Sequence, residues 1–274
     1  MKSDLLAFLA KIHAAPRKSL SQNFLIDSAV IRKMVSLAAI DSGDWVLEIG
    51  PGAGAITQEL LARGAHVYAI EIDPLFAEHL ERLQTPDHRL HIECADFLAF
   101  SFTKLRALNA SWKVVSNIPY QITAPILEVL CESAELFESA TLILQKEVGD
   151  RICAKPRTKQ MGSLTIFVQF YTEFAGAFQI PPTAFYPKPD VESTALRLNF
   201  KHTLPPIDPE MFFPIVRKAF QQRRKMLTTS LKTICPNIRK ALEMAGLSSK
   251  ARPEELSLEE WVSMINQHML EKSS

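Results

Sequence analysis

Residues Asn117, Ile118, Pro119 and Tyr120 have the most specific chemistry in this chain of 274 residues. The Asn117 side-chain oxygen and a backbone carbonyl fixed by Pro119 can accept hydrogen bonds from an exocyclic amine and make its nitrogen more tetrahedral. Tyr120 adds a flat face for a base that has been taken out of its stack. The same residues can also form a turn that only ends a strand, so this interpretation needs support from their surroundings.

A glycine-rich segment, Gly50-Pro51-Gly52-Ala53-Gly54, follows the apolar residues 44–49 and leads into a helical pattern. Glycines at such a place let the backbone approach a ligand at the carboxyl edge of a sheet, so Gly50 and Gly52 are candidate binding residues. Gly50, Gly52 and Ala55 also satisfy the Gly/Ala form of the dinucleotide fingerprint. A nicotinamide or flavin enzyme and a turn without a ligand therefore both stay open.

Two acidic residues stand at the ends of the next two expected strands. Glu71 lies about twenty residues after the glycine loop, where a carboxylate can bind both ribose hydroxyls. Asp96 follows the third strand and is placed to accept a hydrogen bond from an adenine amine. No basic residue for a pyrophosphate stands nearby. The two acids therefore predict an adenosine pocket and favour S-adenosylmethionine, a cationic sulfonium without phosphate, over a dinucleotide.

These residues need a sheet to bring them together. Short apolar runs recur at residues 44–49, 66–72, 90–94, 112–116 and 140–144, with helical patterns such as 55–63 and 75–83 between them. Strands that are apolar on both faces and alternate with helices predict a parallel, doubly wound α/β sheet. Beyond Pro156 we expect a helix over 164–171 and two further strands, 173–179 and 194–200, added to this sheet.

The chain becomes helical in period after a proline-rich segment at residues 201–206. Amphipathic patterns follow at 209–220, 225–234, 238–245 and 258–270, and Ser257-Leu258-Glu259-Glu260 has the sequence of a capping box. We therefore expect an α/β domain over residues 1–200 and a small all-helical domain over residues 201–274.

The composition is that of an ordinary globular protein, with 47% hydrophobic and 22% charged residues, and it excludes a disordered or collagenous chain. The four cysteines are far apart, so we expect neither a metal site nor a disulfide framework. No segment approaches the ~18 apolar residues of a membrane span, and we expect a cytoplasmic protein. Residues 201–274 contain twelve Lys or Arg and eight Asp or Glu, a weak indication of a polyanionic partner.

The glycine-rich segment, residues 117–120 and the run Phe185-Tyr186-Pro187-Lys188-Pro189-Asp190-Val191-Glu192-Ser193 together resemble the ribosomal RNA adenine dimethyltransferases. Residues 17–25, Arg-Lys-Ser-Leu-Ser-Gln-Asn-Phe-Leu, look like the N-terminal motif of that family. The resemblance covers nearly the whole chain. The basic run at residues 222–225 and Pro125 favour the small-subunit branch of the family over the large-subunit resistance enzymes.

The resemblance implies a Rossmann-like, class I S-adenosylmethionine-dependent methyltransferase sheet that releases S-adenosylhomocysteine. The residues that it implies for cofactor binding are Asn23, Leu25, Gly50, Gly52, Glu71, Asp96 and Asn117. Those implied for catalysis at the target adenine are Asn117, Pro119, Tyr120 and Phe185, with Tyr120 and Phe185 on the two faces of the base. Those implied for binding RNA phosphates are Arg17, Lys18, Arg223, Arg224 and Lys225.

The implied activity is dimethylation of the exocyclic N6 amine of two adjacent adenosines near the 3′ end of small-subunit (16S) ribosomal RNA, during biogenesis of the small subunit. The implied partner is that subunit, bound through the helical domain by a monomer that uses no metal and no membrane. Two alternatives stay open: a methyltransferase for another RNA, and a non-catalytic assembly factor that retains the fold. Asn117 argues against the assembly factor, since a binder needs no amine-polarising asparagine.

Overall fold

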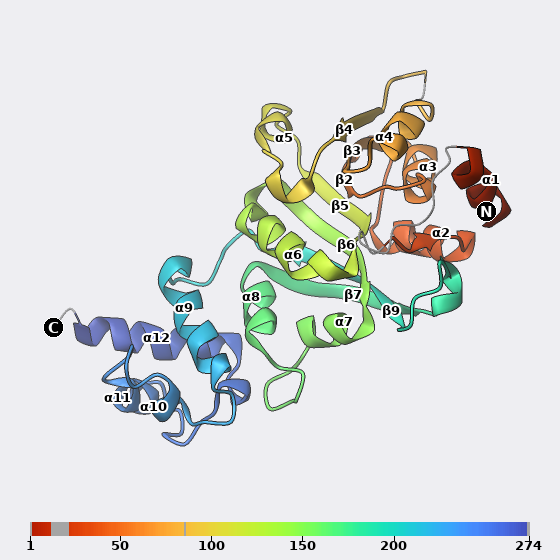
Figure 1. Ribbon diagram of the computed structural model, residues 1–274. Coiled ribbons are helices and arrows are strands. Elements are labelled where there is room, and N and C mark those ends of the chain that lie inside the picture. Colours follow the sequence, from red (N-terminus) through yellow and green to blue (C-terminus); the bar gives the residue numbers. More distant parts are fainter. Residues whose placement is uncertain (1, 12–21, 85, 273–274) are drawn as a thin grey trace. The chain divides into compact units, whose positions relative to one another are not determined.

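The computed structural model in Figure 1 describes residues 2–11, 22–84 and 86–272. The chain splits into two compact units: the first comprises Met1–Gly149 and Glu173–Phe200, and the second comprises Asp150–Thr172 and Lys201–Ser274. One break between the units falls at residue 200, where the sequence predicts a domain boundary. Residues 150–172, which the sequence places in the first domain, group with the helical C-terminal residues instead.

The first unit contains a seven-stranded sheet with the strand order β4-β3-β2-β5-β6-β9-β7. Its strands are β2 Trp45–Ile49, β3 His66–Glu71, β4 Leu90–Cys94, β5 Trp112–Asn117, β6 Phe137–Gln145, β7 Thr172–Ile180 and β9 Ser193–Phe200. Strands β4, β3, β2, β5 and β6 are parallel, whereas β9 runs antiparallel to β6. The predicted parallel sheet with two added strands is confirmed. A second, two-stranded sheet pairs β1 (Phe24–Leu25) with β8 (Phe185–Tyr186).

The α-helices follow the predicted alternation. In chain order they are α1 Lys2–Lys11, α2 Ser28–Leu37, α3 Ala55–Ala62, α4 Pro74–Glu81, α5 Thr103–Ala107, α6 Thr123–Glu132, α7 Lys146–Ile152, α8 Ser163–Tyr171, α9 Pro209–Gln221, α10 Leu227–Ser230, α11 Ile238–Met244 and α12 Leu258–Lys272. Short 3₁₀ turns, among them η2 Phe97–Ala99, η3 Tyr120–Ile122 and η6 Pro253–Glu255, connect several of these elements.

The centre of the sheet is buried on both faces. Val46 and Leu47 are neighbours on β2 and point to opposite faces, and both are 0% exposed. On one face, Met34 of α2 and Leu60 of α3 belong to the same buried cluster as Val46 and Val115. Such a sheet holds the carboxyl ends of its strands at fixed positions.

The strand order reverses between β2 and β5. From β2 the chain continues to β3 and β4 on one side of this point, and from β5 it continues to β6 on the other. In open α/β sheets, ligands bind outside the carboxyl ends of the strands at such a switch point. Strand β2 ends just before Gly50 and β5 ends at Asn117, so the glycine loop and the asparagine motif meet there.

The second unit is helical and has its own core, in which Phe212 and Trp261 are 0% exposed. The predicted capping box begins α12: the Glu260 N–H donates to Ser257 Oγ (3.2 Å), and the Ser257 N–H donates to Glu260 Oε2 (2.8 Å). The predicted helix at 225–234 is wrong in length, since α10 covers only Leu227–Ser230. Three of its four residues, Thr228, Thr229 and Ser230, have a lower helix propensity than Ala or Leu, which agrees with this short helix.

Candidate active site and cofactor cavity

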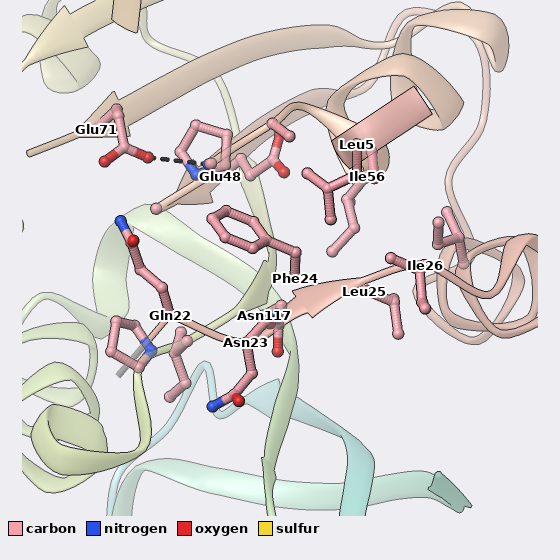
Figure 2. A pocket seen from close by; sticks show the side chains of 18 of the residues that line it. Leu5, Gln22, Asn23, Phe24, Leu25, Ile26, Glu48, Ile56, Glu71 and Asn117 are labelled. Carbon is pink, nitrogen blue, oxygen red and sulfur yellow. Dashed lines mark hydrogen bonds between the residues drawn. The ribbon is translucent and has the colours of Figure 1, made fainter. Parts of the chain in front are cut away.

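A cavity of about 620 Å³ opens in the first unit at the carboxyl ends of β2, β3 and β5. Figure 2 shows side chains from β1, from the loop after β2 and from the ends of β3 and β5 around it. Of the residues predicted for cofactor and substrate, those that line the cavity are Asn23, Leu25, Gly50, Gly52, Glu71, Asn117, Pro119 and Tyr120. Segments that are distant in sequence therefore form one site.

The glycine loop is shaped by its neighbours as well as by its own backbone. Gly52 has φ +55°, and a Cβ added to it would lie 3.0 Å from Cε1 of Phe24. Its N–H donates a hydrogen bond to Glu71 Oε2 (2.9 Å; Figure 2). A side chain at this position would be both strained and crowded. Gly52 thus lets the loop pass between Phe24 and the end of β3.

Glu71 is a buried carboxylate that is held by the backbone. It is 4% exposed, and its second oxygen, Oε1, accepts a hydrogen bond from the Asp73 N–H at 2.9 Å. Burial raises the pKa of Glu71, while the hydrogen bonds from Asp73 and Gly52 oppose that rise. The geometry fixes the carboxylate at the cavity wall, where the sequence predicts a ribose partner.

Glu48 is a second buried carboxylate at the cavity, and sequence reasoning missed it. It lies in β2, is 1% exposed and accepts a hydrogen bond from Thr57 Oγ1 at 2.7 Å. Burial raises its pKa to about 8, against the Thr57 hydrogen bond and with a smaller contribution from the charge of Glu71. The signal that could have identified it is a lone acid inside an apolar strand directly before the glycine loop.

The side chain of Asn117 is oriented by a hydrogen bond from its Nδ2 to the backbone carbonyl of Asn23, at 2.8 Å. Tyr120, in η3, shares a hydrogen bond of 2.6 Å with the Ser193 hydroxyl at the start of β9. Burial raises the pKa of the Tyr120 phenol, although Ser193 partly opposes this. The Asn-Ile-Pro-Tyr motif is thus tied to two other segments of the family resemblance.

Two predicted residues do not line the cavity. Asp96 is exposed, and its Oδ1 accepts a hydrogen bond from the Leu98 N–H (2.9 Å) at the start of η2. Phe185 is only 2% exposed; it pairs with Leu25 across the two-stranded sheet and belongs to the buried cluster of the first unit. Their cofactor and substrate roles stay predictions.

The basic residues predicted to bind RNA differ in their surroundings. Arg17 and Lys18 lie outside the described residues. Arg224 and Lys225 are exposed. Arg223, in contrast, donates hydrogen bonds to the backbone carbonyls of Lys159 (2.7 Å) and Thr158 (3.0 Å).

Helix α1 contributes cavity residues that the sequence did not predict. Leu5 and Phe8 line the cavity, and Leu5 packs in a buried cluster with Phe24 and Phe76. In sequence this segment is only a short apolar run closed by Lys11, which carries no chemical signature. Phe24 was also missed, although it stands between two predicted residues.

The cavity has the chemistry that S-adenosylmethionine requires. Among the described residues that line it none is Lys or Arg, whereas the buried acids Glu48 and Glu71 are both present. Such a wall has no lysine or arginine to repel a cationic sulfonium and offers no partner for a pyrophosphate, which argues against a dinucleotide. Within the described part of the chain, no three His, Cys, Asp or Glu side chains are grouped to hold a metal. None of the described helices is long and apolar enough to cross a membrane.

Comparisons with known proteins identify the family. A family model described as ribosomal RNA adenine dimethylase matches residues 14–269. The chain is 43% identical over 272 residues to a protein of Protochlamydia amoebophila named ribosomal RNA small subunit methyltransferase A, a match that covers 97% of this chain and 95% of that protein. A protein of Chlamydia caviae with the same name is 40% identical, over 99% of this chain and 98% of that protein.

Solved structures agree with this result. A dimethyladenosine transferase from Plasmodium falciparum has the same fold, with a TM-score of 0.78 and 22% identity over 91% of this chain and 98% of that chain. The 23S rRNA methyltransferase ErmE matches with a TM-score of 0.69 and 28% identity, over 89% of this chain and 99% of that chain. This chain therefore has the sheet of S-adenosylmethionine-dependent methyltransferases and belongs to the ribosomal RNA adenine dimethylase family.

Proposed function

We propose that this chain transfers methyl groups from S-adenosylmethionine to the N6 amines of two adjacent adenosines near the 3′ end of small-subunit ribosomal RNA, two to each. One observation carries this proposal most directly: Asn117 stands at the strand switch point, beside Pro119 and Tyr120 in one cavity, with its amide oriented by Asn23. The names of the relatives with 40–43% identity support the small subunit as the substrate.

The chain would act on the amine mainly by positioning it. The Asn117 side-chain oxygen and a backbone carbonyl fixed by Pro119 would accept the two amine hydrogens, so that the nitrogen lone pair leaves the ring plane and faces the methyl donor. Tyr120 would stack on the extruded base, an interaction of about 1–3 kcal/mol. Phe185 would supply the second face; since it is 2% exposed in this structure, the entering adenine would have to uncover it.

Bound S-adenosylmethionine supplies an activated methyl group with a sulfonium leaving group. Glu71 would accept hydrogen bonds from its ribose, because each of its oxygens has a lone pair beyond the one that the Gly52 or Asp73 N–H occupies. Asp96 would bind the adenine amine through Oδ2, since Oδ1 caps η2. Residues Asn23, Leu25, Gly50 and Gly52 would enclose the methionine and ribose portions.

We further propose that residues 1–200 act as the catalytic domain and residues 201–274 as an RNA-binding domain, in a monomer that works in the cytoplasm. The net charge supports the second role, since residues 201–274 have four more basic than acidic residues. We assign no dedicated base, and the proton of the methylated amine would leave to solvent or to a transient acceptor.

The test is transfer of labelled methyl from S-adenosylmethionine to unmethylated small ribosomal subunits, with large subunits and free RNA beside them and nucleoside analysis of the product. Dimethyladenosine in the small subunit alone is the expected result. Cofactor binding without any transfer would contradict the proposal and favour an assembly factor. Transfer to another RNA only would contradict the choice of substrate.

A further inference from the structure

Arg223 binds backbone carbonyls and lies near a carboxylate within the second unit. It follows α9, and its guanidinium donates from Nη1 to the Lys159 carbonyl (2.7 Å) and from Nη2 to the Thr158 carbonyl (3.0 Å). Its Nε lies 3.8 Å from Glu254 Oε2. That carboxylate oxygen is buried and has no hydrogen-bond partner among the described residues. Arg223 therefore supplies the nearby positive charge that this buried oxygen requires.

The segment that Arg223 holds is the loop between α7 and α8 (Figure 1). A second tie comes from η6, because the Arg157 N–H donates to the Glu254 carbonyl at 2.6 Å. Within the loop, Thr158 Oγ1 donates to the Lys155 carbonyl at 2.7 Å. Two segments distant in sequence thus fix the main chain of a loop that has neither a helix nor a strand of its own.

This loop displays cations at alternate positions. Lys155, Arg157 and Lys159 are exposed, and no ion pair to any of them is formed among the described residues. The same holds for Arg224 and Lys225, which follow Arg223 directly in the chain. Because the loop carbonyls of Thr158 and Lys159 bind Arg223, the loop is anchored while its cationic side chains stay in solvent.

We infer that Arg223 is a positioning residue, and that the loop cations Lys155, Arg157 and Lys159, which it holds in place, bind the phosphate backbone of the RNA together with Arg224 and Lys225. The inference rests on the proposed function for the RNA partner. Exposed cations with no acid paired to them are the groups from which phosphate contacts are made, and such contacts give salt-dependent affinity without sequence readout. Both terminal nitrogens of the Arg223 guanidinium donate to loop carbonyls and its Nε faces Glu254, so the orientation of its fork is set by the loop.

The first experiment measures binding of the full chain to unmethylated small ribosomal subunits between about 0.05 and 0.2 M salt. The variant Lys155→Gln, Arg157→Gln, Lys159→Gln leaves Arg223 and its carbonyl acceptors intact. This variant lacks three cations that would each neutralise a phosphate. The negative slope of log affinity against log salt should therefore become shallower by about 2 to 3. Affinity near 0.1 M salt should fall roughly 100-fold. An unchanged slope and affinity in this variant would overturn the inference.

The second experiment separates positioning from direct contact. Arg223→Lys keeps the positive charge but loses the forked geometry that reaches two carbonyls. We expect weaker RNA binding and faster hydrogen exchange of the amides at 157–161 in the free protein. We also expect no further loss of affinity when Arg223→Lys is added to the triple loop variant. An equal loss in both backgrounds would show independent action and make Arg223 a direct phosphate ligand.

The matched control is Arg239→Lys, the same exchange at an exposed position of α11, which should leave loop exchange unchanged. Failure of the inference is distinct from failure of the proposed function. If the unaltered chain neither binds nor methylates small subunits, both are wrong. If it does both, and the triple loop variant does so equally well, only the inference is wrong.

Discussion

The Asn117 side chain donates a hydrogen bond to the backbone carbonyl of Asn23 at 2.8 Å, across 94 positions of sequence. Because Nδ2 is occupied by this bond, the amide cannot rotate freely and Oδ1 faces the other way. An acceptor whose direction is set before the substrate arrives needs no reorganisation during the reaction. The residue directly before β1 thus takes part in orienting the amide that the sequence places at the end of β5.

Replacing Asn117 by Ala should lower the rate of methyl transfer by about 10²–10³ and leave RNA binding unchanged. Asn117→Asp retains an oxygen but sets a carboxylate against the Asn23 carbonyl, so it should also be impaired. Single-turnover transfer to unmethylated small subunits measures the rate, and equilibrium binding of the same particles is the control. If transfer and RNA binding fell together, the role assigned to Asn117 would be wrong.

The ring and the hydroxyl of Tyr120 have separable roles. Tyr120→Phe retains the stacking face and loses the hydrogen bond to Ser193, so it should cost about 1 kcal/mol of stability and little activity. Tyr120→Ala removes the face and should weaken adenine binding in the transition state by about 1–3 kcal/mol, seen as a lower kcat/KM. Ser193→Ala is the matched control and should resemble Tyr120→Phe. A large loss of kcat/KM in both Tyr120→Phe and Ser193→Ala would show that activity depends on the Tyr120 hydroxyl and its hydrogen bond, and not on the ring.

The parallel sheet and the cavity residues at the carboxyl ends of β2, β3 and β5 could be predicted because their signals are local. Apolar strands alternate with helical patterns, and the glycine loop and Asn117 each follow such a strand at its carboxyl end. The capping box at Ser257 is equally local, since its partners are three residues apart. Parallel strands bring their ends to one edge, so residues distant in sequence could be assigned to one site without knowledge of any contact.

The remaining features depend on contacts between distant segments that no local pattern encodes. The place of Glu48 inside an apolar strand indicates burial, but its raised pKa depends on how completely other segments cover it. Arg223 stands in a basic run typical of RNA contacts, yet it binds carbonyls 64 and 65 positions earlier in the chain. The grouping of residues 150–172 with the helical unit likewise comes from tertiary packing, not from composition.

Gly52→Ala should lower stability by about 1–2 kcal/mol and weaken binding of S-adenosylmethionine, because its Cβ would meet the Phe24 ring at 3.0 Å. Gly43→Ala is a suitable control, since Gly43 also has a positive φ, +90°, but no atom within 4 Å of the added Cβ. Thermal unfolding and calorimetric titration with the cofactor measure the two effects. We expect both variants to lose stability and only Gly52→Ala to lose cofactor affinity. An equal loss of affinity in Gly43→Ala would show that backbone strain at a positive φ, and not the contact with Phe24, weakens cofactor binding.

The buried Glu48 carboxyl predicts how stability depends on pH. Its pKa rises from 4.5 to about 8 on folding, chiefly through burial. Between these two values the unfolded chain has lost the proton and the folded chain retains it. The folded state therefore binds more protons than the unfolded state in this range. The contribution of Glu48 to stability is complete below pH 4.5 and is lost as the pH rises through about 8. The effect is on the order of a few kcal/mol.

Glu48→Gln removes this titration and leaves an oxygen that can accept the Thr57 hydroxyl. Its melting temperature should change less between pH 5 and 8 than that of the unaltered chain, which should fall relative to the variant as the pH rises. The test is how the melting temperature changes with pH and not its value at one pH, because the amide hydrogens that Glu48→Gln introduces alter stability at every pH. Glu78→Gln, at an exposed position of α4, is the control and should follow the unaltered chain. Parallel pH profiles for all three proteins would show that Glu48 is ionised in the folded state.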